Sequence, residues 1–186
     1  MLRVWPWEGA CGRDLGSVRK RWAIVILSLL VAATAVTIFC FSAQNAKVSS
    51  AVSGQVTEWL LRAFRPGFAD LSRGEQQALI AQYSHTTRKA AHFTEFLLLG
   101  LFLRLLLQWL RVKWKTGVSW ALGTLYAVTD EFHQMAVSGR AAMARDVLID
   151  SAGVLFGVLL AAGIGYLSRR KKRKAAGLPG DAEGKK

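Results

Sequence analysis

The chain has 186 residues, of which 52% are hydrophobic, and it combines a formal net charge of +13 with a positive mean hydropathy. Nucleic-acid binding is a common property of so basic a chain, but here Lys and Arg cluster at the ends of apolar runs and not along one soluble face. The composition therefore indicates membrane spans with the positive charge placed outside them, and no nucleic-acid partner.

Four apolar segments are long enough to cross the hydrocarbon core of a bilayer, which takes about 20 residues of helix. They cover residues 22–41, 90–110, 118–137 and 147–167. The first follows Arg19-Lys20-Arg21 as a signal peptide would, but it is longer than a signal-peptide core and no small-x-small cleavage site follows it. We therefore expect a retained anchor and an all-α fold, a polytopic membrane protein with a four-transmembrane-helix bundle.

Lys and Arg are divided unevenly between the connecting segments. Sixteen of them lie in residues 1–21, in the short turn after the second span and in the tail, whereas eight lie in the other two loops. The positive-inside rule therefore predicts that both termini are cytoplasmic. We expect a basic N-terminal segment 1–21, a membrane domain 22–167 with an outer loop 42–89, and a basic, disordered tail 168–186.

The outer loop is too polar to cross the bilayer, but its first half has a helical pattern. Its apolar residues recur at helical spacing and predict an amphipathic helix in the membrane interface: Val48, Val52, Val56, Trp59, Leu60, Ala63 and Phe64. Pro66-Gly67 should end that helix. Ser72-x-x-Glu75 is a capping-box pattern and predicts a second short helix that continues through Tyr83.

With this topology, four polar stretches fall in one layer at the outer side of the membrane. They contain Ser42 and Gln44 after the first span, Arg88, Lys89, His92 and Glu95 before the second, Asp130, Glu131, His133 and Gln134 at the end of the third, and Arg140, Asp146 and Asp150 at the fourth. Ionisable groups in lipid are costly unless paired, so each polar stripe should face the bundle interior. We expect these residues to line a ligand-binding pocket.

Other interpretations of the same residues remain open. If Glu95 and Asp150 pair with Arg88 and Arg140, they would have the purely structural role of fixing the register of neighbouring helices. His92-x-x-Glu95 resembles half of a carboxylate metal site between bundle helices, so a divalent metal held by His92, Glu95 and His133, with Asp130 or Glu131 nearby, is a minor alternative. Intramembrane proteolysis is weaker still, because the His-Glu-x-x-His pattern of helical zinc proteases is absent. A hydrolytic triad on Ser42 is disfavoured because no nucleophile elbow surrounds it. If the site is catalytic, its candidate residues are His92, Glu95, Asp130 and His133.

Three functions compete on these grounds. The first is binding of an envelope lipid headgroup or lipophilic antibiotic, in which the arginines donate to phosphate and the carboxylates accept from amines or sugar hydroxyls. The second is an intramembrane metal-dependent hydrolase or transferase. The third is a structural or assembly role, homo-oligomerisation included, with Gly153-x-x-x-Gly157 as the contact face. No cofactor can be assigned.

The order of the four polar motifs resembles the VanZ-like family over about residues 23–167. The motifs are Phe-Ser-x-Gln at 41–44, Arg-Lys-x-x-His-x-x-Glu at 88–95, Asp-Glu-x-His-Gln at 130–134, and Arg-x5-Asp-x3-Asp at 140–150. Ala43, Phe96 and Ser138 depart from the residues common there. The resemblance implies a small bacterial membrane protein. It also implies a link to antibiotic resistance or envelope homeostasis, because the founding member is associated with low-level resistance to the glycopeptide teicoplanin. A lipid-linked envelope component or a glycopeptide would then be the partner.

Overall fold

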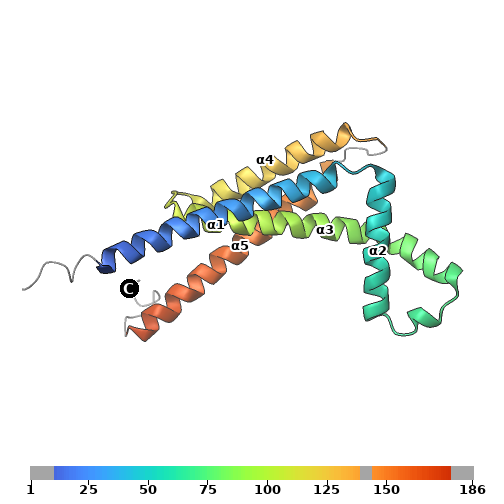
Figure 1. The fold of residues 1–186 in the computed structure, drawn as a ribbon, viewed down its shortest axis with the longest axis horizontal. Helices are drawn as coiled ribbons and strands as arrows, with labels where there is room; N and C mark the ends of the chain where they lie inside the picture. The colour runs from blue at the N-terminus through green and yellow to red at the C-terminus, as the bar shows by residue number, and fades with distance from the viewer. Residues whose placement is uncertain (1–10, 139–143, 177–186) are drawn as a thin grey trace, which may run out of the picture.

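The computed structural model describes residues 11–138 and 144–176, and every regular element in those ranges is helical. In chain order the elements are α1 (Cys11–Ser42), α2 (Ala46–Phe64), the 3-10 turn η1 (Phe68–Asp70), α3 (Arg73–Trp109), α4 (Lys115–Met135) and α5 (Ala144–Ala175). Figure 1 shows α1 and α4 side by side, α5 diverging towards its C-terminus, and α2 crossing α3 at one end of the bundle. The all-α class is confirmed.

Three of these helices are long and apolar enough to cross a membrane, namely residues Gly16–Ser42 of α1, α3 and α5. The expected third span coincides with α4. This helix is not one of the three candidate spans, because it contains many small and polar residues and is less apolar. The structure therefore supports a membrane protein with three candidate spans, and the fourth crossing stays a prediction. Large hydrophobic side chains such as Trp22, Leu29 and Leu159 are exposed on the candidate spans, as lipid contact requires.

α3 corrects one expectation of the sequence analysis. Its N-terminus is the predicted capping box, in which Ser72 and Glu75 bond each other's backbone amides. The helix does not stop after Tyr83, however, but runs on without a break to Trp109. No Gly or Pro occurs between Gly74 and Gly100, so nothing in this stretch ends the helix. At about 1.5 Å per residue it is about 55 Å long, well beyond the roughly 30 Å of the hydrocarbon core.

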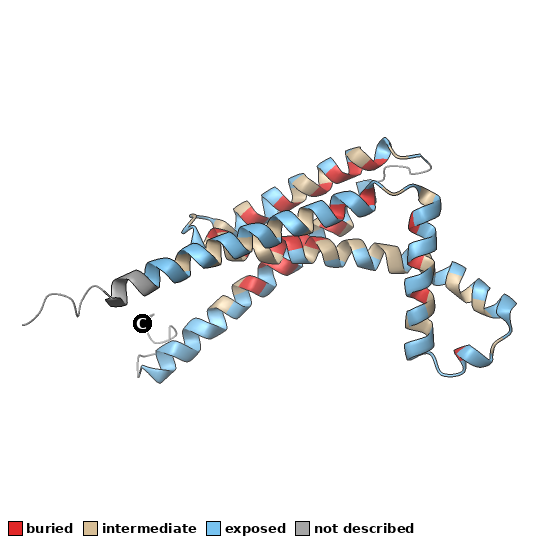
Figure 2. Ribbon diagram, in the orientation of Figure 1, coloured by how far each residue is buried: buried red, intermediate tan, exposed pale blue. Residues whose placement is uncertain are grey.

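α2 is helical as predicted, and its two faces are unusual. Asn45 caps its start, and the chain leaves it at Arg65, before Gly67 adopts a left-handed φ of 75°. The face buried against α3 carries hydroxyl groups, from Ser49, Ser53 and Thr57. The opposite, apolar face is exposed, as the blue colouring of much of α2 in Figure 2 indicates, and includes Val48, Val52, Val56, Trp59 and Phe64.

The tightest packing joins α3 to α5. A β-carbon on Gly153 or Gly157 would overlap the backbone carbonyl of Phe93 or Leu97 on α3. The predicted close contact at Gly153-x-x-x-Gly157 is therefore present, but its partner is α3 of the same chain. This corrects the hypothesis that the glycine face is free for an assembly partner. The apolar core, around Phe96 and Val154, lies where α1, α3, α4 and α5 meet, and Figure 2 shows buried residues concentrated at this crossing.

Both ends of the membrane domain are more helical than expected. α1 already begins at Cys11, within the basic N-terminal segment. α5 continues to Ala175, so residues 168–175 are helical where a disordered tail was predicted. Lys and Arg side chains tolerate helix well, and those in the last turn interact favourably with the helix dipole. Residues 1–10 and 177–186 lie outside the described part of the chain.

Candidate functional site

The end of α1 is hydrogen-bonded to α4 through three buried polar side chains. Ser42 Oγ donates to Asp130 Oδ2 at 2.7 Å, and Gln134 Nε2 donates to the same oxygen at 2.8 Å. Gln134 Nε2 also lies 3.2 Å from Ser42 Oγ. Ser42, Asp130 and Gln134 are each at least nine-tenths buried. The helical spacing of Asp130 and Gln134 turns both side chains to the same face, and α1 supplies the third partner.

A second convergence brings three helices together. One ligand-type atom each of His92 on α3, Asp130 on α4 and Asp150 on α5 lie within 4.8 Å of one another. Asp130 and Asp150 are each only 4% exposed. Two carboxylates and an imidazole from three helices therefore share one small volume in the bundle. Sequence analysis predicted that these residues lie in one layer, and this group forms the centre of that layer.

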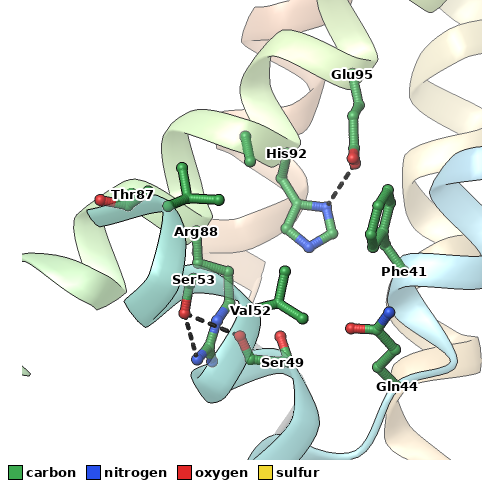
Figure 3. Close-up of a pocket in the computed structure, with 11 residues that line it drawn as sticks. Phe41, Gln44, Ser49, Val52, Ser53, Thr87, Arg88, His92 and Glu95 are labelled. Carbon is green, nitrogen blue, oxygen red and sulfur yellow. Dashed lines mark hydrogen bonds and ion pairs between the residues drawn. The ribbon is translucent and has the colours of Figure 1, made fainter. Parts of the chain in front are cut away.

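A cavity of about 160 Å³ opens beside this centre, between the end of α1, α2 and α3. Figure 3 shows His92 and Glu95 projecting from α3 towards Phe41 and Gln44, with Arg88 close to α2. Its polar lining consists of Gln44, Ser49, Ser53, Thr87, Arg88, His92 and Glu95. Valines of α2 and Phe41 supply apolar walls. The cavity is thus lined by polar side chains of both α2 and α3 and by apolar side chains of α1 and α2.

Arg88 and Glu95 each carry a buried polar atom that lacks a hydrogen bond to any described residue. Arg88 Nη2 donates to Ser50 Oγ at 2.8 Å and lies 3.3 Å from Ser53 Oγ, but Arg88 Nε has no partner. Glu95 Oε2 likewise has none, and His92 Nδ1 lies 3.6 Å from it. An unsatisfied buried group costs about 1–3 kcal/mol. The residues that line the cavity therefore include one donor and one acceptor without a hydrogen-bond partner.

The remaining predicted site residues lie around this centre. Lys89 forms an ion pair with Asp146 and so joins α3 to α5 outside the cavity. The His133 ring stacks on Phe39, with centroids 4.3 Å apart, and it is not part of the group formed by His92. Glu131 is buried next to Asp130 on α4. Arg140 lies outside the described residues.

Sequence reasoning missed the contribution of α2. Ser50 and Ser53 hold the Arg88 guanidinium, and Thr57 donates to Thr87 at 2.7 Å. The available signal was the spacing of Ser49, Ser53 and Thr57 at i, i+4 and i+8, which places three hydroxyls on one helix face.

Comparison with protein families identifies one match to this chain. The model of the family described as VanZ/LLP1 matches residues 24–165, which include Ser42, the residues that line the cavity, and His92, Asp130 and Asp150. No curated protein matches the chain, and neither does any solved structure.

Proposed function

This chain belongs to the VanZ/LLP1 family of membrane proteins, and we propose that it binds the phosphate-bearing headgroup of an envelope lipid in the cavity between α2 and α3. The observation that carries the proposal is the unsatisfied pair at the cavity wall, Arg88 Nε and Glu95 Oε2. A guanidinium donates to phosphate oxygens, and a carboxylate accepts from an amine or a hydroxyl. A headgroup that carries both a phosphate and an amine or hydroxyl would satisfy the two atoms together.

The dimensions of the cavity favour a lipid headgroup over a whole glycopeptide. Its volume of about 160 Å³ is below the roughly 300–1,000 Å³ of pockets that enclose drug-sized ligands. An open groove of about 530 Å³ adjoins it and shares Val56, Thr87, Ala91 and Glu95 with it. Leu60, Tyr83 and Leu98 line this groove and provide a mainly apolar path for an acyl chain. A lipophilic glycopeptide such as teicoplanin would reach the same groove only with its acyl tail. A role in teicoplanin resistance or envelope homeostasis would follow from this binding.

The proposed orientation places the cavity at the outer face of a bacterial cell membrane. α3 ends and α5 begins at opposite ends of the bundle, and α4 brings the chain back from one end to the other (Figure 1). If α1, α3 and α5 cross the bilayer, α4 must therefore cross it too, and its 21 residues span about 31 Å. The basic end of α5 then lies in the cytoplasm with the N-terminus, by the positive-inside rule.

Native mass spectrometry of the purified chain in detergent tests the binding. The probes are phosphatidylglycerol, phosphatidylethanolamine and phosphatidylcholine, together with a diacylglycerol that lacks phosphate. We expect a phospholipid with an amine or hydroxyl headgroup to be retained over diacylglycerol. Arg88→Gln and Glu95→Gln should each weaken that retention about 10–100-fold, since each removes a charge-assisted hydrogen bond.

Arg62→Gln is the matched control, because Arg62 is exposed on α2 and pairs with Glu58 away from the cavity. Equal retention of diacylglycerol and the phospholipids would overturn the proposal. The proposal would also be overturned if Arg88→Gln and Glu95→Gln retained the phospholipid as well as Arg62→Gln does.

A further inference from the structure

The group formed by His92, Asp130 and Asp150 has the composition of a metal-binding site. An imidazole and two carboxylates are common ligands of divalent transition metals, and three protein ligands leave a coordination position open. Each ligand comes from a different helix, α3, α4 or α5, and one ligand-type atom of each lies within 4.8 Å of the others. Ligand atoms held about 2.0–2.2 Å from one zinc ion lie roughly 3–4 Å apart, so closing the site needs shifts of about 1 Å.

The burial and the negative charge of Asp130 and Asp150 favour a bound cation at this position. Asp130 and Asp150 are each 4% exposed, so water solvates neither carboxylate well. Of the described cations near these residues in sequence, Lys89 pairs with Asp146, Arg88 donates to the serines of α2, and Arg145 is exposed. Adjacent buried carboxylates repel each other strongly in a medium of low dielectric constant. A divalent cation between them would remove this repulsion.

The surroundings of Asp130 match the usual support of a metal ligand. Ligating carboxylates are themselves hydrogen-bonded, and these outer bonds fix their orientation. Ser42 and Gln134 both donate to Asp130 Oδ2, at 2.7 and 2.8 Å, so they fix the orientation of the carboxylate. The bond from Ser42 would therefore orient a metal ligand as well as join α1 to α4.

We propose that His92, Asp130 and Asp150 bind one divalent transition-metal ion of the Zn²⁺ class inside the bundle. This ligand set differs from the His92, Glu95 and His133 combination that the sequence suggested, because His133 stacks on Phe39. His92 also lines the lipid cavity, so the open coordination position lies next to it. The metal site goes beyond lipid binding and does not depend on it.

Zinc titration of the full chain tests this site without added lipid. The protein is purified in detergent with a histidine-free tag, stripped with a chelator and titrated with Zn²⁺ by calorimetry, and bound metal is measured by mass spectrometry. We expect one saturable site per chain. Asp150→Asn and His92→Gln should each weaken it by at least about tenfold, the scale on which even supporting residues affect metal affinity.

Two matched variants control for adventitious binding. His85→Ala removes an exposed histidine on the same helix as His92, and Asp146→Asn removes a carboxylate four residues before Asp150 on α5. Both should retain the site. The proposal is overturned if the wild-type chain shows no saturable zinc site, or if zinc binding is lost in His85→Ala and kept in Asp150→Asn. Size-exclusion profiles verify that every variant is folded, and Asp150→Ala replaces Asp150→Asn if that variant does not fold.

Discussion

Ser42 Oγ donates a hydrogen bond to Asp130 Oδ2 at 2.7 Å, and this bond joins the last residue of α1 to the C-terminal part of α4. The two residues are 88 positions apart in the chain, and both are almost fully buried. The bond fixes the ends of two neighbouring helices at the same level. It also aligns the Asp130 carboxylate with His92 and Asp150.

Replacing Ser42 by alanine should destabilise the bundle. The change removes a buried hydrogen bond to a carboxylate, and such bonds contribute about 1.5–3 kcal/mol. We expect a loss of that size in the free energy of unfolding, measured by denaturation in detergent. Ser84→Ala is the control, because Ser84 Oγ donates only to the Ala81 carbonyl within α3. Equal stability of the two variants would show that the bond to Asp130 contributes nothing.

Glycine 157 should not tolerate even a methyl group. Its β-carbon would overlap the Leu97 carbonyl oxygen, so Gly157→Ala must push α3 and α5 apart. Overpacking of this kind costs about 1–3 kcal/mol, and the melting temperature in detergent should fall accordingly. Gly163→Ala on the same helix meets no atom within 4 Å and should leave the melting temperature unchanged or slightly raised. A Gly157→Ala variant as stable as Gly163→Ala would contradict the close α3–α5 packing.

The ion pair of Lys89 and Asp146 should couple α3 to α5 energetically. Exposed pairs are worth about 0.2–1 kcal/mol, and this pair is largely shielded, so we expect a coupling of about 1–2 kcal/mol. A double-mutant cycle with Lys89→Met and Asp146→Asn measures it through unfolding in detergent. If the free-energy losses of the two single variants sum to the loss of the double variant within about 0.3–0.5 kcal/mol, the pair is not coupled.

Cysteine labelling should reveal whether α4 crosses the membrane. In a chain whose native Cys11 and Cys40 are replaced by serine, Lys113→Cys and Ser138→Cys place single thiols at opposite ends of α4, and both positions are exposed. A membrane-impermeant maleimide applied to intact cells should label Ser138→Cys at once, and Lys113→Cys only after permeabilisation. Equal labelling of both positions from outside would refute a fourth span.

Much of the secondary structure could be predicted from local signals. The apolar run that ends near Ser42, the break at Pro66-Gly67 and the capping box at Ser72 and Glu75 all depend on residues close together in the sequence. The prediction failed where a local signal was absent: nothing between Gly74 and Gly100 stops α3, so the expected second loop helix and the second span are one helix. The prediction of a disordered tail from residue 168 was wrong as far as Ala175 for the same reason, because no Gly or Pro ends α5 before that residue.

The sequence alone determined which residues are polar within apolar surroundings, and helical periodicity grouped them into stripes. Periodicity does not fix how far each helix rotates or which helix it faces. Helix packing sets these rotations. Gly153 and Gly157 let α5 lie close against α3, and this contact places Asp150 near His92. Packing also placed serines of α2 against Arg88, and it stacked His133 on Phe39. Contacts between residues far apart in the chain depend on these rotations, so only the tertiary structure could select His92, Asp130 and Asp150 from the predicted polar layer.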